Sequence, residues 1–337
     1  MLQTADKIRE IAGADARALP DEVLASTEPL VLRGLVAHWP IVAAARESMQ
    51  AASRYILGFY RDATVGAMLG APEIGGRYFY NEDLSGFNFK SVKIRLDAVL
   101  DEIARHAASE RPPSIYVGST TIDAALPGFR THNDIDLGTR NALASIWLGN
   151  RTRIAAHHDL PDNLACVAVG RRRFTLFPPE QIRNLYVGPL DITPAGQAVS
   201  LVDFAKPDYA RFPRFAQAEK AARVAELGPG DAIFIPSMWW HHIESLDALN
   251  VLVNYWWRQS PAYMDAPIGA LMLAIMTVRD LPPAQRAAWQ NLFRHYVFEA
   301  DRDTAAHIPE ASRWSLGPLN EDAVREMRAR LLARLNR

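Results

Sequence analysis

The sequence predicts a mainly β protein, a sandwich or barrel of short strands with helices on its flanks. Between Ser114 and Trp257, short β-prone runs follow one another, and loops rich in Pro, Gly, Asp and Asn separate them. This pattern is typical of antiparallel β folds and not of alternating βαβ units. We expect strands at Ser114 to Val117, Ala144 to Leu148, Arg153 to His157, Leu164 to Phe177, Ala232 to Ile235 and Asn250 to Trp257.

The region before Ser114 mixes helical and β patterns. We expect residues 1–28 to be helical and polar, and a first strand to run from Pro29 to a glycine at Gly34. The alanine-rich stretch Ala43 to Leu69 has no internal proline and is expected to be mostly helix. Leu96 to Ala108 carries apolar residues at i, i+3, i+4 and i+7, the spacing of an amphipathic helix.

Two further segments complete the chain. Pro178 to Gly230 carries prolines and charges, so we expect a surface loop between two strands. After Pro261 the β pattern stops, and we expect three helices: one over Ile268 to Met276, one from Pro282-Pro283 to about Phe298, and one capped by Asn320. The chain therefore divides into a β domain with N-terminal helices, residues 1–260, and a helical segment, residues 261–337.

Composition limits the classes of function. The sequence has 37 basic and 38 acidic residues, so no excess charge favours nucleic acid or an acidic membrane as a partner. The single cysteine, Cys166, excludes an internal disulfide framework and fits a reducing compartment. Met1 to Glu22 has no apolar core of a signal peptide, and the longest apolar run, Ala266 to Val278, is too short to span a bilayer. We expect a cytoplasmic protein.

Two histidine pairs stand out among apolar neighbours. His157 and Asp159, at i and i+2, point to one face of a strand, and His158 points to the other. Two such ligands and one distant histidine make a 2-His-1-carboxylate site, which binds one face of an iron ion and leaves the opposite positions open.

The third ligand has to come from another strand. Gly228-Pro229-Gly230-Asp231 forms a turn that leads into the strand Ala232 to Ile235, which Pro236 ends, and Trp239-Trp240-His241-His242 follows. In an extended segment only one of His241 and His242 faces inward. Alternation alone does not say which.

These motifs resemble the cupin-like branch of the JmjC-type iron and 2-oxoglutarate oxygenases, and within it most nearly the asparaginyl hydroxylases that act on hypoxia-inducible factor. The resemblance is strongest over residues 150–260. Its motifs are Ala156-His157-His158-Asp159, Leu176-Phe177-Pro178-Pro179, Pro207-Asp208-Tyr209-Ala210-Arg211-Phe212-Pro213, Gly228 to Ser245 and Val253-Asn254-Tyr255-Trp256.

The resemblance implies a double-stranded β-helix, the jelly-roll barrel of cupins, and it selects His241 as the third ligand. It implies that His157, Asp159 and His241 bind Fe(II) and carry the catalysis. The cosubstrates would be 2-oxoglutarate and O2. The substrate would be a protein side chain or a small molecule, and the reaction its hydroxylation.

The resemblance also implies residues for the cosubstrate. Arg172 matches a basic residue that pairs with the distal carboxylate of 2-oxoglutarate, and arginine offers that carboxylate a bidentate partner. Arg171 and Arg173 lie on the opposite face by alternation, and we expect them to be solvated. The remaining expected cofactor-binding residues are Tyr116, Asn163, Asn254 and Trp256, with Tyr78 and Tyr80 near the rim of the substrate groove.

Departures from the family's pattern leave the substrate open. A threonine that binds the cosubstrate is replaced by Ile154, and two substrate-contacting glutamines are replaced by Gly118 and Pro161. Asparagine hydroxylation therefore does not carry over. A JmjC-type demethylase of N-methyl groups is a second hypothesis, and a non-catalytic cupin that acts as a sensor or scaffold is a third.

The helical segment suggests a partner. Apolar residues recur on each of its three expected helices, more than a solvated tail would carry. They can pack on the barrel, but the C-terminal helices of the resembling hydroxylases form a two-fold dimer. We therefore expect a homodimer.

Overall fold

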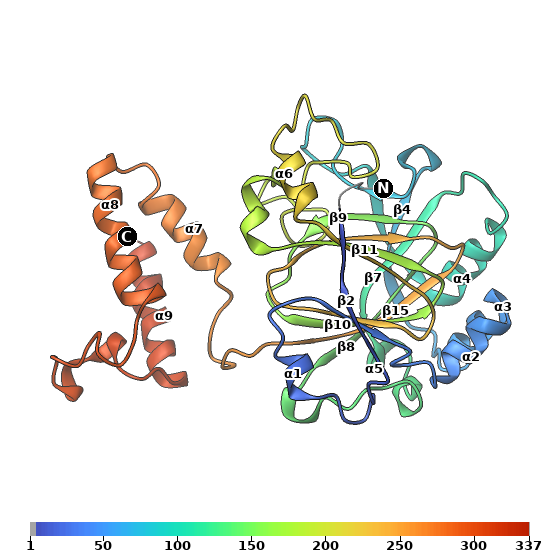
Figure 1. Cartoon of the computed structure of the whole chain (residues 1–337), viewed down its shortest axis with the longest axis horizontal. Coiled ribbons are helices and arrows are strands. Elements are labelled where there is room, and N and C mark those ends of the chain that lie inside the picture. The colour runs from blue at the N-terminus through green and yellow to red at the C-terminus, as the bar shows by residue number, and fades with distance from the viewer. Residues whose placement is uncertain (1–4, 337) are drawn as a thin grey trace. The chain divides into compact units, whose positions relative to one another are not determined.

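The computed structural model describes residues 5–336 of the chain. The chain divides into two compact units, Met1–Gln259 and Ser260–Arg337. The first unit holds two β-sheets, and the described part of the second consists of helices and the turns that join them (Figure 1). No helix in the described residues combines the length and the apolar character that crossing a membrane requires.

The first unit is a jelly roll of two sheets, as the sequence predicts. Neighbouring strands are antiparallel except for three parallel pairs, β1–β12, β2–β3 and β5–β9. The larger sheet has the order β2 Arg9–Ala12, β3 Leu30–Arg33, β13 Ala232–Ile235, β10 Asp162–Val169, β15 Asn250–Trp257, β8 Leu143–Gly149, β7 Ser114–Thr121, β4 Thr64–Gly70 and β6 Phe89–Arg95. The smaller has the order β1 Asp6–Lys7, β12 Arg223–Leu227, β11 Arg172–Phe177, β14 Trp240–Ser245, β9 Arg153–His157 and β5 Arg77–Tyr78.

Helices accompany both units. The first unit contains α1 Asp21–Leu24, α2 Pro40–Glu47, α3 Met49–Leu57, α4 Leu96–Arg105, α5 Ile122–Ala125 and α6 Phe215–Lys220. The second contains α7 Ile268–Thr277, α8 Pro283–Phe293, a π-helical turn at Arg294–Phe298, and α9 Glu321–Leu335. Asn320 caps α9 as predicted, because its side-chain oxygen accepts the N–H of Ala323 at 2.9 Å.

Alternation along β11 shows how the layers pack. Phe174 and Leu176 point between the sheets, where they pack in one cluster with Ile233 of the larger sheet. Phe177 points to the outer face and packs against Phe215 of α6. Side chains from α2, α3 and α4 pack in one buried cluster with outward-facing residues of the larger sheet. The space between the sheets is thus closed on both sides by apolar layers.

Several predicted strands have the bounds that the pattern gave. β9, β13 and β15 start and end at the predicted residues. The predicted turn is also present, since the N–H of Asp231 bonds to the carbonyl of Gly228 at 3.1 Å. Gly230 has a φ of +104°, and a Cβ there would lie 3.0 Å from Ala37 Cα, so the turn requires glycine.

Two helix predictions in the N-terminal region were wrong. Residues 5–28 form β1, β2 and only a short helix, α1, while residues 1–4 lie outside the described part. The stretch Ala43 to Leu69 forms α2 and α3 but ends in the strand β4. In both places hydrogen bonding to distant strands overrides the local pattern: β2 pairs with β3, and β4 lies between β6 and β7.

The expectation of a surface loop over Pro178 to Gly230 was also wrong. The segment contributes α6 and the strand β12, which lies inside the smaller sheet between β1 and β11. Its side chains Leu185, Val202 and Phe212 are buried in a cluster on the outer face of that sheet. It is therefore a packed layer of the fold.

Candidate functional site

The three predicted metal ligands meet between the sheets. Pairing of β14 with β9 sets His241 opposite His157, and their ring centroids are 4.3 Å apart. Asp159 follows the end of β9, and its Oδ2 lies 3.6 Å from His241 Nε2. One nitrogen or oxygen atom of each of the three residues lies within 4.8 Å of the others. This is a group of donors that is able to bind one metal ion.

Backbone hydrogen bonds orient both imidazoles. Nδ1 of His157 is 2.9 Å from the carbonyl of Ala155, and Nδ1 of His241 is 3.0 Å from the carbonyl of Trp239. A carbonyl only accepts, so each Nδ1 carries a proton, and in the neutral form of either ring Nε2 is the nitrogen with the lone pair. Burial, and then the neighbouring His157, lowers the pKa of His241 to about 4. The His241 ring is therefore neutral at pH 7, the form that binds a metal.

The second histidine of each pair, His158 and His242, lies outside the group of candidate ligands. The ring of His158 packs edge-on against Trp240, with centroids 4.7 Å apart. His242 packs against Phe204 at 5.0 Å, on the outer side of the smaller sheet. Alternation along β9 and β14 thus separates one histidine of each pair from the triad.

A cavity of about 310 Å³ adjoins the triad. Its walls come from the inner faces of both sheets and from residues 194–199, which lie within the segment that was predicted to be a surface loop. Aromatic rings form a continuous part of the wall, with Tyr116 stacked on Trp147 at 6.0 Å and Trp147 edge-on to Trp256 at 5.6 Å. The cavity is large enough for a small organic molecule beside a metal ion.

Arg172 is the unusual charge of this cavity. Its side chain lines the wall, is 1% exposed, and its Nε and Nη2 have no hydrogen-bond partner in the described structure. Burial lowers the pKa of its guanidinium to about 10, so it still carries its charge at pH 7. A buried cation without a counter-charge is costly, which makes this a place for an anion.

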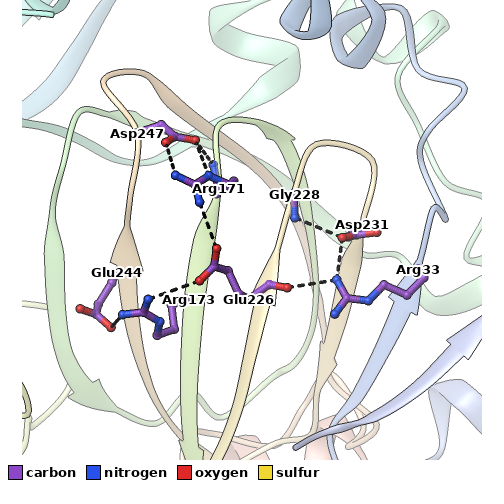
Figure 2. Close-up of polar contacts among 8 residues, drawn as sticks. All are labelled: Arg33, Arg171, Arg173, Glu226, Gly228, Asp231, Glu244 and Asp247. Atoms are coloured by element: carbon purple, nitrogen blue, oxygen red, sulfur yellow. Dashed lines mark hydrogen bonds and ion pairs between the residues drawn. The ribbon is translucent and has the colours of Figure 1, made fainter. Parts of the chain in front are cut away.

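The neighbouring arginines behave differently. Figure 2 shows Arg171 paired with Asp247 and Glu226, and Arg173 paired with Glu226 and Glu244. Both lie on the outside of the sheet, as alternation predicts. The Arg171 side chain is 54% exposed, in line with the expected solvation, and the Arg173 side chain is 23% exposed; both are in addition held in ion pairs.

The other predicted cofactor residues all line the same cavity. Burial raises the pKa of Tyr116 to about 12, so its hydroxyl is a neutral donor at pH 7. Trp147 Nε1 donates to Asn254 Oδ1 at 2.7 Å, and Asn254 Nδ2 donates to Asn163 Oδ1 at 3.1 Å. This chain of bonds fixes both asparagines. Trp256 also lines the wall, and its Nε1 is buried without a partner in the described structure.

The residues that depart from the family pattern are placed unequally. Ile154 and Gly118 line the cavity, whereas Pro161 does not. Of the two tyrosines expected near the rim, Tyr78 lines the cavity, and its hydroxyl donates to the carbonyl of Met68. The Tyr80 hydroxyl donates to the carbonyl of Ile192 and does not reach the lining.

Sequence reasoning missed part of the lining. Met68, Ser119 and Trp147 face the cavity, as do Pro194, Ala195, Gly196 and Val199. Trp147 lies in a predicted strand, and alternation from its neighbours in the core places it on the inner face. The segment 194–199 gave no local signal, because only the fold brings it over the cavity.

Together, the jelly roll and the His-Asp-His group define a β-barrel protein of the cupin type with side chains able to bind a metal ion. Residues 16–263 match the model of the cupin-like domain, and the chain therefore belongs to that family.

Three relatives illustrate the range of the family. The chain is 29% identical over 243 residues to lysine-specific demethylase 8 of Xenopus tropicalis. The aligned residues cover 70% of this chain and 49% of that protein. The chain is 32% identical over 164 residues to HSPB1-associated protein 1 of Homo sapiens (46% and 32% covered). It is 32% identical over 106 residues to tRNA wybutosine-synthesizing protein 5 of Gallus gallus (32% and 30% covered). The chain thus spans half or less of these relatives, and the finer resemblance to asparaginyl hydroxylases stays a prediction.

The buried histidines predict an acid-sensitive fold. Burial lowers the pKa of His242 to about 4, whereas an unfolded histidine titrates near about 6.5. Between these values the unfolded chain binds more protons, so stability falls as the pH falls. We expect His242 alone to lower the free energy of unfolding of the metal-free protein by about 2 kcal/mol between pH 7 and pH 5.

Urea unfolding at both pH values measures this loss. His242→Gln is expected to reduce the pH dependence, whereas His132→Gln, at an exposed position, is expected to leave it unchanged. An equal pH dependence in the wild type and His242→Gln would show that His242 is not held neutral.

Proposed function

We propose that the chain is an Fe(II)- and 2-oxoglutarate-dependent oxygenase that hydroxylates a protein side chain or a small molecule. The observation that supports this best is the buried, unpartnered guanidinium of Arg172 in the same cavity as the His-Asp-His group. A metal site with open positions beside a buried cation suits a ligand with a chelating end and a distal carboxylate. 2-Oxoglutarate is such a ligand.

In this proposal each residue of the cavity has a task. His157 and His241 would hold iron through Nε2, and Asp159 through a carboxylate oxygen. Arg172 would neutralise the distal carboxylate, and the Tyr116 hydroxyl would donate to it. When bound, iron with 2-oxoglutarate and O2 supplies the oxidation that inserts one oxygen atom into a C–H bond.

The rest of the lining protects and orients the reactants. The bonded series Trp147–Asn254–Asn163 fixes polar groups beside the metal site. Ile154, in place of a hydroxyl side chain, leaves that part of the wall apolar. Aromatic and aliphatic walls exclude water, which strengthens the attraction between Arg172 and a bound carboxylate.

Demethylation of N-methyl groups is the second candidate. The relatives from Xenopus tropicalis and Arabidopsis thaliana are named lysine-specific demethylases, the latter 35% identical over 133 residues. The rings of Tyr78, Trp147 and Trp256 line the cavity and could attract a methylated cation. Hydroxylation of an N-methyl carbon uses the same centre. The products separate the candidates by mass: a hydroxylated substrate gains an oxygen atom, and a demethylated one loses a methylene.

We further propose that the chain forms a homodimer through its helical unit. Among the described hydrophobic residues of this unit, only Ala305 is buried. Phe298 is 78% exposed, Trp314 69% and Leu335 54%, so these helices do not bury their apolar side chains among themselves. A stable dimer buries roughly 800 Å² per partner, and a two-fold pairing would cover such side chains without creating an open polymer.

Enzyme activity is tested by succinate release. With Fe(II), 2-oxoglutarate and O2, the wild type is expected to release succinate, and His157→Ala to lose this activity because one ligand is missing. His158→Ala, beside it in the chain but outside the triad, is the matched control and should retain activity. Release that is equal in wild type and His157→Ala, or absent from a wild type that binds iron, would contradict the proposal and favour a non-catalytic cupin.

The role of Arg172 is tested by calorimetry on Mn(II)-loaded protein. Arg172→Ala is expected to weaken 2-oxoglutarate at least about tenfold, since a charged hydrogen bond contributes about 1.5–3 kcal/mol. Mn(II) affinity should stay close to that of the wild type, and Arg172→Lys should retain part of the 2-oxoglutarate affinity. Arg171→Ala, which removes a charge on the outside of the same sheet, should change neither. Equal affinity in Arg172→Ala and wild type would place the anion site elsewhere.

The dimer is tested by sedimentation of the intact chain at micromolar concentration. We expect the mass of two chains for the wild type. We expect the mass of one chain for Leu331→Arg, which puts a charge into the apolar stripe that Val324, Met327, Leu331 and Leu335 form on α9. Ala329→Arg changes the opposite side of that helix and should leave the dimer intact. A monomeric wild type would refute the proposal and leave packing on the barrel as the fate of these residues.

A further inference from the structure

One loop carries the candidate ligand Asp159, a second loop leads into the strand of His241, and the two loops are bonded to each other. The first, residues 158–161, follows β9 and holds Asp159. The second, residues 236–239, precedes His241. The N–H of Met238 donates to the carbonyl of Asp159 at 2.9 Å, and Ser237 Oγ donates to the carbonyl of Leu160 at 2.6 Å. The carbonyls of Asp159 and of the next residue, Leu160, are thus tied to the loop that leads to His241.

Asp162 completes this connection from outside the cavity. It begins β10, is 3% exposed, and does not line the cavity, whereas its neighbour Asn163 does. Its Oδ1 accepts the N–H of Ser237 at 2.9 Å, and its Oδ2 accepts Gln259 Nε2 at 2.7 Å. Gln259 is the last residue of the first unit. One buried carboxylate, next in the chain to the first loop, therefore joins the second loop to a residue just beyond the end of β15.

The second loop has a conformation that requires such support. Met238 has a φ of +68°, in the left-handed region that non-glycine residues seldom adopt. The two bonds that Ser237 donates, to Asp162 and Leu160, and the bond that Met238 donates hold this turn against the loop of Asp159. Without them, we expect the loop to relax and the separation of Asp159 and His241 to vary.

We propose that Asp162 is a positioning residue for the metal centre: through Ser237 it sets Asp159 against His241 Nε2, and so sets metal affinity and coordination geometry. The inference rests on the proposed metal site and adds to it a residue outside the ligand set. Groups that orient metal ligands typically change metal affinity about 10–100-fold when removed.

Asp231 provides a matched control. It also is an aspartate at the start of a strand, and it also accepts backbone N–H groups, those of Gly34 at 3.0 Å and Gly228 at 3.1 Å. Figure 2 shows its carboxylate bonded to Arg33 and Gly228. Among the described residues, the partners of its side chain are Arg33, Gly34 and Gly228, none of them a candidate metal ligand. Loss of Asp231 should destabilise the fold without reaching the metal site.

The experiment compares the full-length wild type with Asp162→Ala, Asp162→Asn, Ser237→Ala and Asp231→Ala. Three quantities are measured for each: the dissociation constant for Mn(II), the visible absorption spectrum of the Co(II)-loaded protein, and urea unfolding of the metal-free protein. We expect Asp162→Ala to raise the dissociation constant about tenfold or more and to alter the Co(II) spectrum. Asp162→Asn keeps an oxygen for the Ser237 N–H and should restore most of the affinity and the spectrum.

Asp231→Ala is expected to lower the free energy of unfolding while leaving Mn(II) affinity and the Co(II) spectrum unchanged. If Asp162→Ala does not fold, Ser237→Ala decides, because it removes only the bond to Leu160 and should still weaken Mn(II). Wild-type affinity and spectrum in Asp162→Ala, or in Ser237→Ala when only that variant folds, would overturn the inference. So would an equal loss of affinity in Asp231→Ala. A wild type that binds neither metal would instead refute the metal centre itself.

Discussion

The register between β9 and β14 is the constraint on which the candidate site depends. It sets His157 opposite His241, so that both rings face the space between the sheets. A shift of either strand by one residue would exchange these side chains for His158 or His242 and turn the donors to the outer face. On its other side β14 pairs with β11, and the register of that pairing places the Arg172 side chain on the inner face of the sheet, toward the cavity.

The inward arginine links the fold to the proposed chemistry. A protein that needed only stability would not keep a buried guanidinium with unpaired nitrogens, because apolar side chains of similar size would cost less. The glutamates on the neighbouring strands, Glu226 and Glu244, lie on the outer face, where they pair with Arg171 and Arg173. A ligand that brings its own carboxylate would satisfy the charge, and for this reason we propose an anionic cosubstrate for the cavity.

Local patterns predicted the parts of the structure that depend on local spacing. The strands β9, β13 and β15 and the cap at Asn320 were predicted correctly because alternation, turns and caps are short-range features. The strand β4, the packed segment 178–230 and the bonds of Asp162 were missed, since they depend on pairing and packing with distant residues. Local spacing also could not decide whether His241 or His242 is the candidate ligand, because that depends on the register between β14 and β9.

The most direct test of this account is a crystal structure of the full chain with Mn(II) and 2-oxoglutarate under anaerobic conditions. The account predicts one metal ion held by His157, Asp159 and His241. It also predicts the distal carboxylate of 2-oxoglutarate on Arg172. A metal ion bound through His158 or His242, or a 2-oxoglutarate whose distal carboxylate meets another cation, would contradict it.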